Sequence, residues 1–100
     1  MAVSQLHELK TDPEPFKQVW HSRKLFELRK NDRGFKAGDV LHLREHDRAV
    51  PEGRYSGKSI LVLVVYVLDS VEERGLKKEF VAMSIKLLAR LDGGQPVGMT

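Results

Sequence analysis

The sequence contains no cysteine. This absence excludes disulfide bonds and thiolate metal ligands. The four histidines stand at scattered positions without the spacing of a metal site, so we expect neither a metal ion nor another cofactor. The sequence also lacks a phosphate-binding glycine loop and the strand-turn-helix motif that carries a serine nucleophile. Two common routes to catalysis are thereby removed.

No apolar run is long enough to cross a membrane. The longest one, Ile60–Leu68, falls far below the roughly 20 residues that a spanning helix needs. Charged residues appear within the first ten positions, so no secretion signal is expected. These features predict a cytoplasmic protein without a membrane partner. A chain of 100 residues, 41% apolar and 31% charged, has the size and composition of one folded domain.

Hydrophobic periodicity predicts a mainly β domain with one main helix. Phe16, Val19 and Trp20 recur at helical spacing, and Thr11 and Glu14 have the spacing of a capping box before them. Strands are expected over residues 7–10, 25–30, 39–45, 59–68 and 80–88. Five or six such short strands predict a small, strongly curved sheet or barrel, because the connection 31–38 is too short for the helical crossover of a parallel sheet.

The remaining segments define the expected limits of the domain. Residues 46–58 contain proline and glycine among charged residues and are expected to form an exposed loop, while residues 70–73 are expected to form a helical turn or loop. Residues 1–91 are predicted to be the domain and 92–100 a flexible tail. Ile60–Leu68 is apolar on both alternating faces, which predicts a core strand or a subunit contact, including the contact of a homodimer.

Positive charge gathers in residues 24–38, which hold five basic and two acidic side chains. This local excess equals the net charge of the whole chain, +3. A basic cluster beside a carboxylate suits a ligand with both anionic oxygens and hydrogen-bond donors, such as a nucleotide or RNA. The predicted binding residues are Lys10, Lys24, Glu27, Arg29, Lys30, Arg33 and Lys36.

Residues 25–30 alternate, with Phe26 and Leu28 on one face and Glu27 and Arg29 on the other. We expect the apolar face to point inward, which leaves Glu27 and Arg29 about 7 Å apart on the outer face. There they could share a ligand, or form a solvated ion pair that contributes about 0–1 kcal/mol. Lys24 could contact a phosphate or, if its ammonium lost a proton, act as a base or nucleophile.

Four further side chains are candidates for contact with a ligand. Phe35 and Trp20 could stack on a base, although the position of Trp20 in the helical stripe favours packing, and Phe35 is expected to fill the core. His7 and His42 could reach the cleft. Gly38, which precedes Asp39, marks a turn that enters a strand.

Six segments resemble the ASCH group of the PUA-like β-barrels, specifically its small, single-domain branch of bacteria and their phages. They are His7–Lys10, the helix Pro13–Ser22, Arg23–Lys30, Asn31–Arg33, Phe35–Asp39 and Phe80–Ile85. The resemblance implies an α+β, mainly β, pseudo-barrel of five or six strands, with a charged cleft between the helix and the strand that bears Glu27 and Arg29. It also implies binding of RNA or of a modified nucleotide.

Some small bacterial members of this group look like amidohydrolases that remove the acetyl group from acetylated cytidine. They use a lysine and a threonine of a Gly-Arg-Lys-Thr-x-Thr-x-Arg strand, with a later glutamate. By this resemblance Lys24 and Arg29 match, whereas Glu27 replaces the threonine and no later glutamate aligns. An enzyme of this kind would use Lys24 and Glu27 for catalysis. A third alternative is a phage or host interaction module that contacts a protein through residues 60–68 and the basic face.

Overall fold

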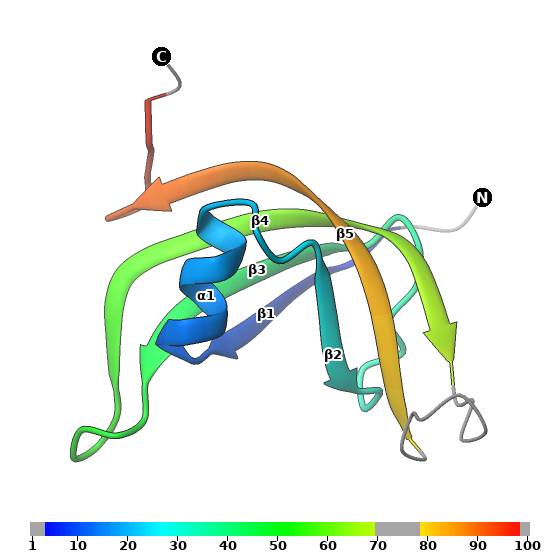
Figure 1. The fold of residues 1–100 in the computed structure, drawn as a ribbon, viewed down its shortest axis with the longest axis horizontal. Helices are drawn as coiled ribbons and strands as arrows, with labels where there is room; N and C mark the ends of the chain where they lie inside the picture. Colours follow the sequence, from blue (N-terminus) through cyan, green and yellow to red (C-terminus); the bar gives the residue numbers. More distant parts are fainter. Residues whose placement is uncertain (1–3, 70–78, 99–100) are drawn as a thin grey trace.

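The computed structural model describes residues 4–69 and 79–98. They form β1 (Leu6–Thr11), α1 (Pro13–Trp20), β2 (Phe26–Lys30), β3 (Val40–Asp47), β4 (Arg54–Asp69), β5 (Phe80–Asp92) and β6 (Gln95–Pro96). The strands curl into a half-barrel, with α1 packed beside β3 (Figure 1). A mainly β fold with a short helix and a strongly curved sheet, as expected from the sequence, is confirmed.

The sheet runs in the order β1-β3-β4-β5-β2, with β6 added beside β5. β1 and β3 are parallel, whereas the other neighbouring strands are antiparallel. β1 and β2 are therefore the edges of the main sheet, and they do not pair with each other. The residues predicted as a tail include β6, which pairs with the end of β5.

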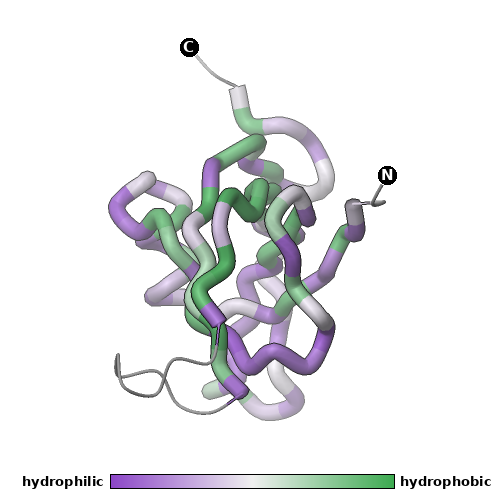
Figure 2. The backbone as a smooth tube through the Cα atoms, turned by 90° about the vertical axis from the view of Figure 1, so that its right-hand side faces the viewer, coloured by the Kyte–Doolittle hydropathy of each residue, from purple (hydrophilic) through white to green (hydrophobic). Residues whose placement is uncertain are grey.

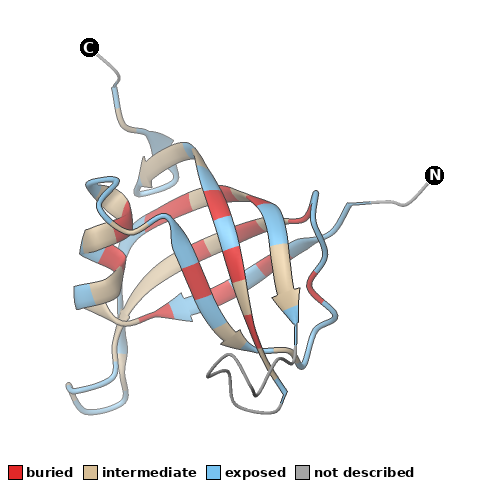
Figure 3. Ribbon diagram, turned by 45° about the vertical axis from the view of Figure 1, so that its right-hand side comes forward, coloured by how far each residue is buried: buried red, intermediate tan, exposed pale blue. Residues whose placement is uncertain are grey.

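The hydrophobic core lies inside the curl of the sheet. Buried residues alternate with more exposed ones along β2 and β5 (Figure 3), and hydrophobic and hydrophilic stretches alternate along the chain (Figure 2). Phe16 and Val19 of α1 are buried in this core, and Trp20 packs against it, which confirms the helical stripe. Phe35 is also buried in the core, which excludes it as an exposed stacking surface. The strands supply Leu9, Leu41, Leu43, Ile60, Val62, Val64, Val81, Met83 and Ile85.

The predicted orientation of β2 is wrong. Phe26 and Leu28 are 54% and 52% exposed, whereas Glu27 is only 3% exposed. The register with β5 explains this, because Glu27 lies opposite the core residue Met83. Alternation shows which residues share a face, but it does not show which face is buried. In this strand the charged face points into the half-barrel, and neighbouring cations neutralise its carboxylate.

The predicted loop 46–58 is also wrong over most of its length. β3 and β4 extend into it from both sides and leave only residues 48–53 as the connection. Pro51 and Gly53 lie in this turn, whereas Gly57 lies within β4. Gly53 has a φ of 69°, and a Cβ atom there would lie 2.7 Å from the His46 ring. A side chain at position 53 would therefore be strained by its backbone angle, and the His46 ring would have to move.

Two smaller expectations concern local structure. Thr11 does not cap α1: it ends β1, and its hydroxyl donates to the Leu9 carbonyl at 3.5 Å, while Asp12 occupies the N-cap position. The expected turn at residues 70–73 lies outside the described residues. Among the described residues, no helix has the length and apolar character that spanning a membrane requires.

Candidate functional site

A buried carboxylate, Glu27, lies at the centre of the site. Its Oε1 accepts a hydrogen bond from Lys24 Nζ, and its Oε2 accepts one from Arg29 Nε, each at 3.0 Å. The two cations neutralise a side chain that is 3% exposed. A carboxylate has about four acceptor positions, so lone pairs remain for a further donor. Glu27 therefore has acceptor capacity beyond its two present hydrogen bonds.

Lys24 reaches the site from the segment between α1 and β2. Besides Glu27, its Nζ contacts the Phe26 carbonyl oxygen at 2.7 Å and lies 4.9 Å from the centre of the Phe26 ring. Its side chain is 18% exposed. The ammonium is thus held in place by three contacts on one side and keeps some access to solvent on the other.

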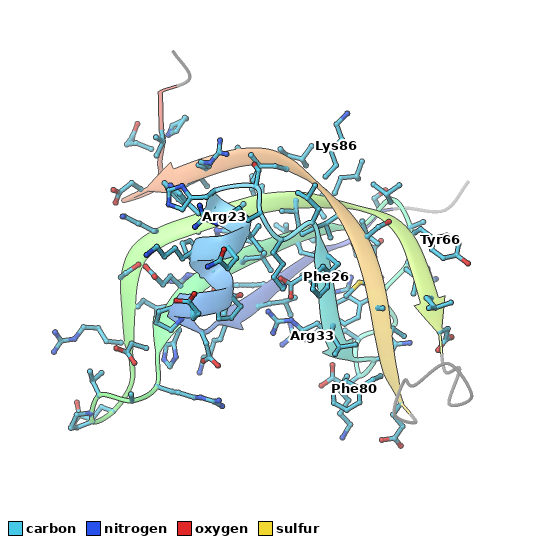
Figure 4. All side chains as sticks on the ribbon, in the orientation of Figure 1. Arg23, Phe26, Arg33, Tyr66, Phe80 and Lys86 are labelled. Carbon is cyan, nitrogen blue, oxygen red and sulfur yellow. The ribbon has the colours of Figure 1, made fainter. Side chains whose placement is uncertain are left out.

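Arg29 ties the two edge strands of the sheet together. Its Nη1 donates to the Lys10 carbonyl and its Nη2 to the Thr11 hydroxyl, both at 3.1 Å. Arg33, from the connection after β2, reaches toward β1 (Figure 4), where its Nη1 donates to the Glu8 carbonyl at 2.8 Å. The open seam between β1 and β2 is therefore bridged by arginine side chains.

A pocket of about 560 Å³ opens at one end of this seam. Its walls come from the end of β1, the start of α1, β2 and the β3–β4 hairpin. We call it the Glu27 pocket. Its charged lining residues are Lys10, Lys24, Arg29 and Arg48 with Asp12 and Glu27. Cations outnumber carboxylates, so the pocket attracts anionic groups.

The cations of the Glu27 pocket differ in how far they are already engaged. Arg48 Nη2 pairs with Asp12 Oδ2 at 3.3 Å, but the Arg48 side chain is 80% exposed. Among the described residues, no carboxylate lies within ion-pair distance of the Lys10 ammonium. Lys10 is consequently the cation at this pocket that is most readily available to a phosphate.

The structure separates the predicted binding residues into groups. Lys10, Lys24, Glu27 and Arg29 line one pocket. Arg33 lies farther along the seam, in a neighbouring hollow. Lys30 lines a different hollow, 4.0 Å from Glu79, and the Lys36 side chain is exposed on the turn before β3. A contribution of Lys30 or Lys36 to binding stays a prediction.

Several pocket residues have no clear signal in the sequence. The spacing of Thr11 and Glu14 indicates a helix cap. In the structure Thr11 instead ends β1 and accepts a hydrogen bond from Arg29. His46 and Arg48 also line the pocket, although they fall in the segment expected to be a loop. They line the Glu27 pocket only because β3 and β4 pair as a long hairpin. Such a long-range arrangement leaves no local motif.

A second buried carboxylate, Asp39, lies outside the Glu27 pocket. It accepts hydrogen bonds from His7 Nε2 at 2.8 Å, from the Gln5 N–H at 3.2 Å and from the Lys36 N–H at 3.0 Å. Burial raises the pKa of Asp39, but the hydrogen bonds from His7 and the two backbone groups outweigh it, so the pKa lies below its usual value. The His7 ring makes this hydrogen bond and also packs edge-on against the Phe35 ring. It does not line the Glu27 pocket.

Comparison with known proteins identifies a family but no activity. Residues 6–85 match the family described as a domain of unknown function, DUF3850. The chain belongs to this family. Every residue that lines the Glu27 pocket falls inside the DUF3850 match, whereas the segment 92–100 lies beyond it. No curated protein matches the sequence. Within residues 4–69 and 79–98, no three His, Asp or Glu side chains gather as a set that could hold a metal ion.

Proposed function

We propose that this chain is a PUA-like module of the ASCH group that binds a nucleotide or single-stranded RNA in the Glu27 pocket. A bacterial or phage origin and a cytoplasmic location form part of the proposal. The observation that carries it is a buried carboxylate, fixed by Lys24 and Arg29, in a pocket that also holds Lys10, a cation without an ion pair to any described residue.

The chemistry of a nucleotide matches both kinds of group in this pocket. Glu27 has free lone pairs that can accept from an exocyclic amine or a ring N–H of a base. Lys10 and the exposed Arg48 can contact a phosphate. The volume of about 560 Å³ lies within the range of roughly 300–1,000 Å³ that is typical of small-molecule sites.

Calorimetric titration tests this proposal. The four ribonucleoside 5′-monophosphates and their parent nucleosides would be titrated at low and at high salt. We expect at least one monophosphate to bind more tightly than its nucleoside. For a short RNA, log affinity should fall by about 0.7 for each tenfold rise in salt per neutralised phosphate. Binding that is independent of salt, or no binding of any of these compounds, would contradict the proposal.

A second candidate function is hydrolysis of an acylated nucleobase such as acetylated cytidine. It is favoured by the 3.0 Å contact between Lys24 Nζ and Glu27 Oε1 at the pocket wall. Glu27 would take a proton from a water molecule that attacks the amide carbonyl, and Lys24 would stabilise the developing oxyanion. The C–N bond would break, the proton would pass to the leaving amine, and acetate would be released.

Chromatographic turnover of acetylated cytidine separates this candidate from simple binding. The enzymatic function predicts conversion to cytidine by the wild type and loss of conversion in Lys24→Ala and in Glu27→Gln. Lys36→Ala, which removes a cation outside the pocket, serves as the matched control and should retain the rate. A folded wild type that shows no turnover would reject catalysis on this substrate and leave the binding function in place.

The apolar surface available for contact with a second protein, including a second copy of this chain, is smaller than the sequence suggested. Ile60, Val62 and Val64 are buried in the chain's own core. Within residues 60–68, Val65 and Tyr66 are the well exposed apolar side chains. We therefore keep this role as the third proposal. Sedimentation equilibrium of the wild type and of Tyr66→Lys tests it, since a dimer through this surface should dissociate in the variant.

A further inference from the structure

We propose that the binding groove continues beyond the Glu27 pocket to a second base position at Tyr55, so that the ligand is a single-stranded oligonucleotide of at least two nucleotides. This inference rests on the proposed nucleotide-binding function and specifies its ligand. Three observations support it: a second hollow on the same seam, an aromatic ring held in position there, and cations at the junction of the two hollows.

The second hollow has a volume of about 540 Å³ and is lined by Glu8, Leu9, Lys10, Arg29, Arg33 and Tyr55. We call it the Tyr55 hollow. It shares Lys10 and Arg29 with the Glu27 pocket. Both cavities follow the seam where Arg29 and Arg33 reach from the β2 side to the carbonyls of β1. They are thus adjacent parts of one groove.

The Tyr55 ring is held in position by its neighbours. The guanidinium carbon of Arg44 lies 3.8 Å from the ring centroid, and the His46 ring meets it edge-on at 4.8 Å. Arg44 is itself fixed by Glu8, with 2.6 Å between Nη1 and Oε1. Tyr55 still remains 38% exposed. One face of the ring is covered by Arg44, so a base would stack on the exposed remainder of the ring at this groove.

The shared cations lie where a phosphodiester would have to pass. A strand with one base against Glu27 and the next against Tyr55 places its linking phosphate near the junction, which Lys10 and Arg29 form. Arg33 extends the positive charge to the far wall of the Tyr55 hollow. Its neighbour Glu8 is neutralised by Arg44. A single nucleotide would leave this second part of the groove empty.

The test compares ligand lengths and tyrosine variants. Homopolymeric mono-, di- and triribonucleotides of each base would be titrated into the wild type, Tyr55→Leu and Tyr55→Phe. Stacking of a base on an aromatic ring predicts a gain of about 5- to 150-fold from mono- to dinucleotide. Tyr55→Leu should remove this gain and leave mononucleotide affinity within about twofold, whereas Tyr55→Phe should keep it.

Tyr66→Leu provides the matched control. Tyr66 is 62% exposed near the opposite end of β4, far from the hairpin (Figure 4), so its substitution should change neither affinity. A measurement on the wild-type fold complements the variants: the chain has two tyrosines, and the Tyr55 ring resonances should shift with a dinucleotide but not with a mononucleotide.

The outcomes separate this inference from the proposed function. Equal affinities for mono- and dinucleotides, or a gain that persists in folded Tyr55→Leu, would overturn the second base position and leave the Glu27 pocket as a nucleotide site. Failure of every nucleotide to bind would overturn both. If Tyr55→Leu does not fold, unchanged Tyr55 resonances in the wild type on dinucleotide binding would overturn the inference alone.

Discussion

Glu27 and Asp39 are both 3% exposed, yet their surroundings are of opposite kinds. Asp39 is held by a buried histidine and two backbone N–H groups. Glu27 is held by the ends of two long basic side chains, which are 18% and 24% exposed, and it lines a pocket. Burial alone therefore does not distinguish a structural carboxylate from one at a binding site.

The difference lies in what the partners can do. The two backbone N–H groups are fixed in direction and cannot turn away from Asp39, and the buried His7 ring would lose its partner without it. Lys24 and Arg29 can rotate toward a ligand and share their charge with it. Asp39 joins the turn before β3 to the start of β1 and is assigned to the fold, whereas the proposed function assigns Glu27 to ligand binding.

The largest expected effect is on stability at Asp39. Asp39→Ala removes the acceptor of three hydrogen bonds and leaves the buried His7 ring without this partner. We expect the free energy of unfolding in urea at neutral pH to fall by about 3–5 kcal/mol. Asp32→Ala, at a side chain that is 63% exposed, is the control and should cost less than about 0.5 kcal/mol. A similar small loss in Asp39→Ala would refute its structural role.

Glu27→Gln should lower the free energy of unfolding less than Asp39→Ala does, and it should lower nucleotide affinity. It keeps the side-chain shape but removes the charge between Lys24 and Arg29, whose partly exposed ends can turn to water. We expect the free energy of unfolding to fall by about 1–3 kcal/mol, and nucleotide affinity in calorimetry to fall by about 10- to 150-fold. Unchanged affinity in a folded variant would mean that Glu27 is only structural.

The pH dependence of stability extends the comparison. Because the pKa of Asp39 is lowered from its ordinary value of 3.8, its stabilising effect is complete above the unfolded-state pKa and is lost as pH falls through the folded-state pKa. The stability difference between wild type and Asp39→Asn should thus stay constant above about pH 5 and shrink in stronger acid. Urea unfolding over this range measures it. A stability difference that grows in acid would contradict a lowered pKa of Asp39.

The smallest expected effect is a difference in RNA affinity between variants of two lysines, Lys10 and Lys36. Lys10→Ala should lower the affinity for a short RNA several-fold and reduce its salt slope by about 0.7, because one phosphate contact is lost. Lys36→Ala should change both quantities less than Lys10→Ala does, since Lys36 lies outside the Glu27 pocket. Fluorescence anisotropy at several salt concentrations measures both. Equal effects would indicate diffuse attraction by the whole cluster.

These contrasts also show what local sequence can reveal. The helical stripe of Phe16 and Val19 and the strand alternation predicted the curved, mainly β fold, because both patterns depend on neighbouring residues. The pairing of Glu27 with Arg29 followed from the strand period, because residues two apart share a face. These parts of the fold and site were accessible without a structure.

Other features depended on contacts between distant segments. The alternation of β2 did not show that Glu27 faces Met83, since that orientation is set by the register with β5. His46 and Arg48 joined the pocket through the long β3–β4 hairpin. Proline and glycine in residues 46–58 indicated a turn, but not how short it would be.

The most direct test of the account is an amide NMR titration of the wild type with the four ribonucleoside 5′-monophosphates. We predict that at least one shifts the resonances of residues 10–12 and 24–29 and leaves those of His7 and Asp39 in place. Shifts confined to the surroundings of Asp39, or no shifts at all, would contradict the assignment of Glu27 to binding and Asp39 to the fold.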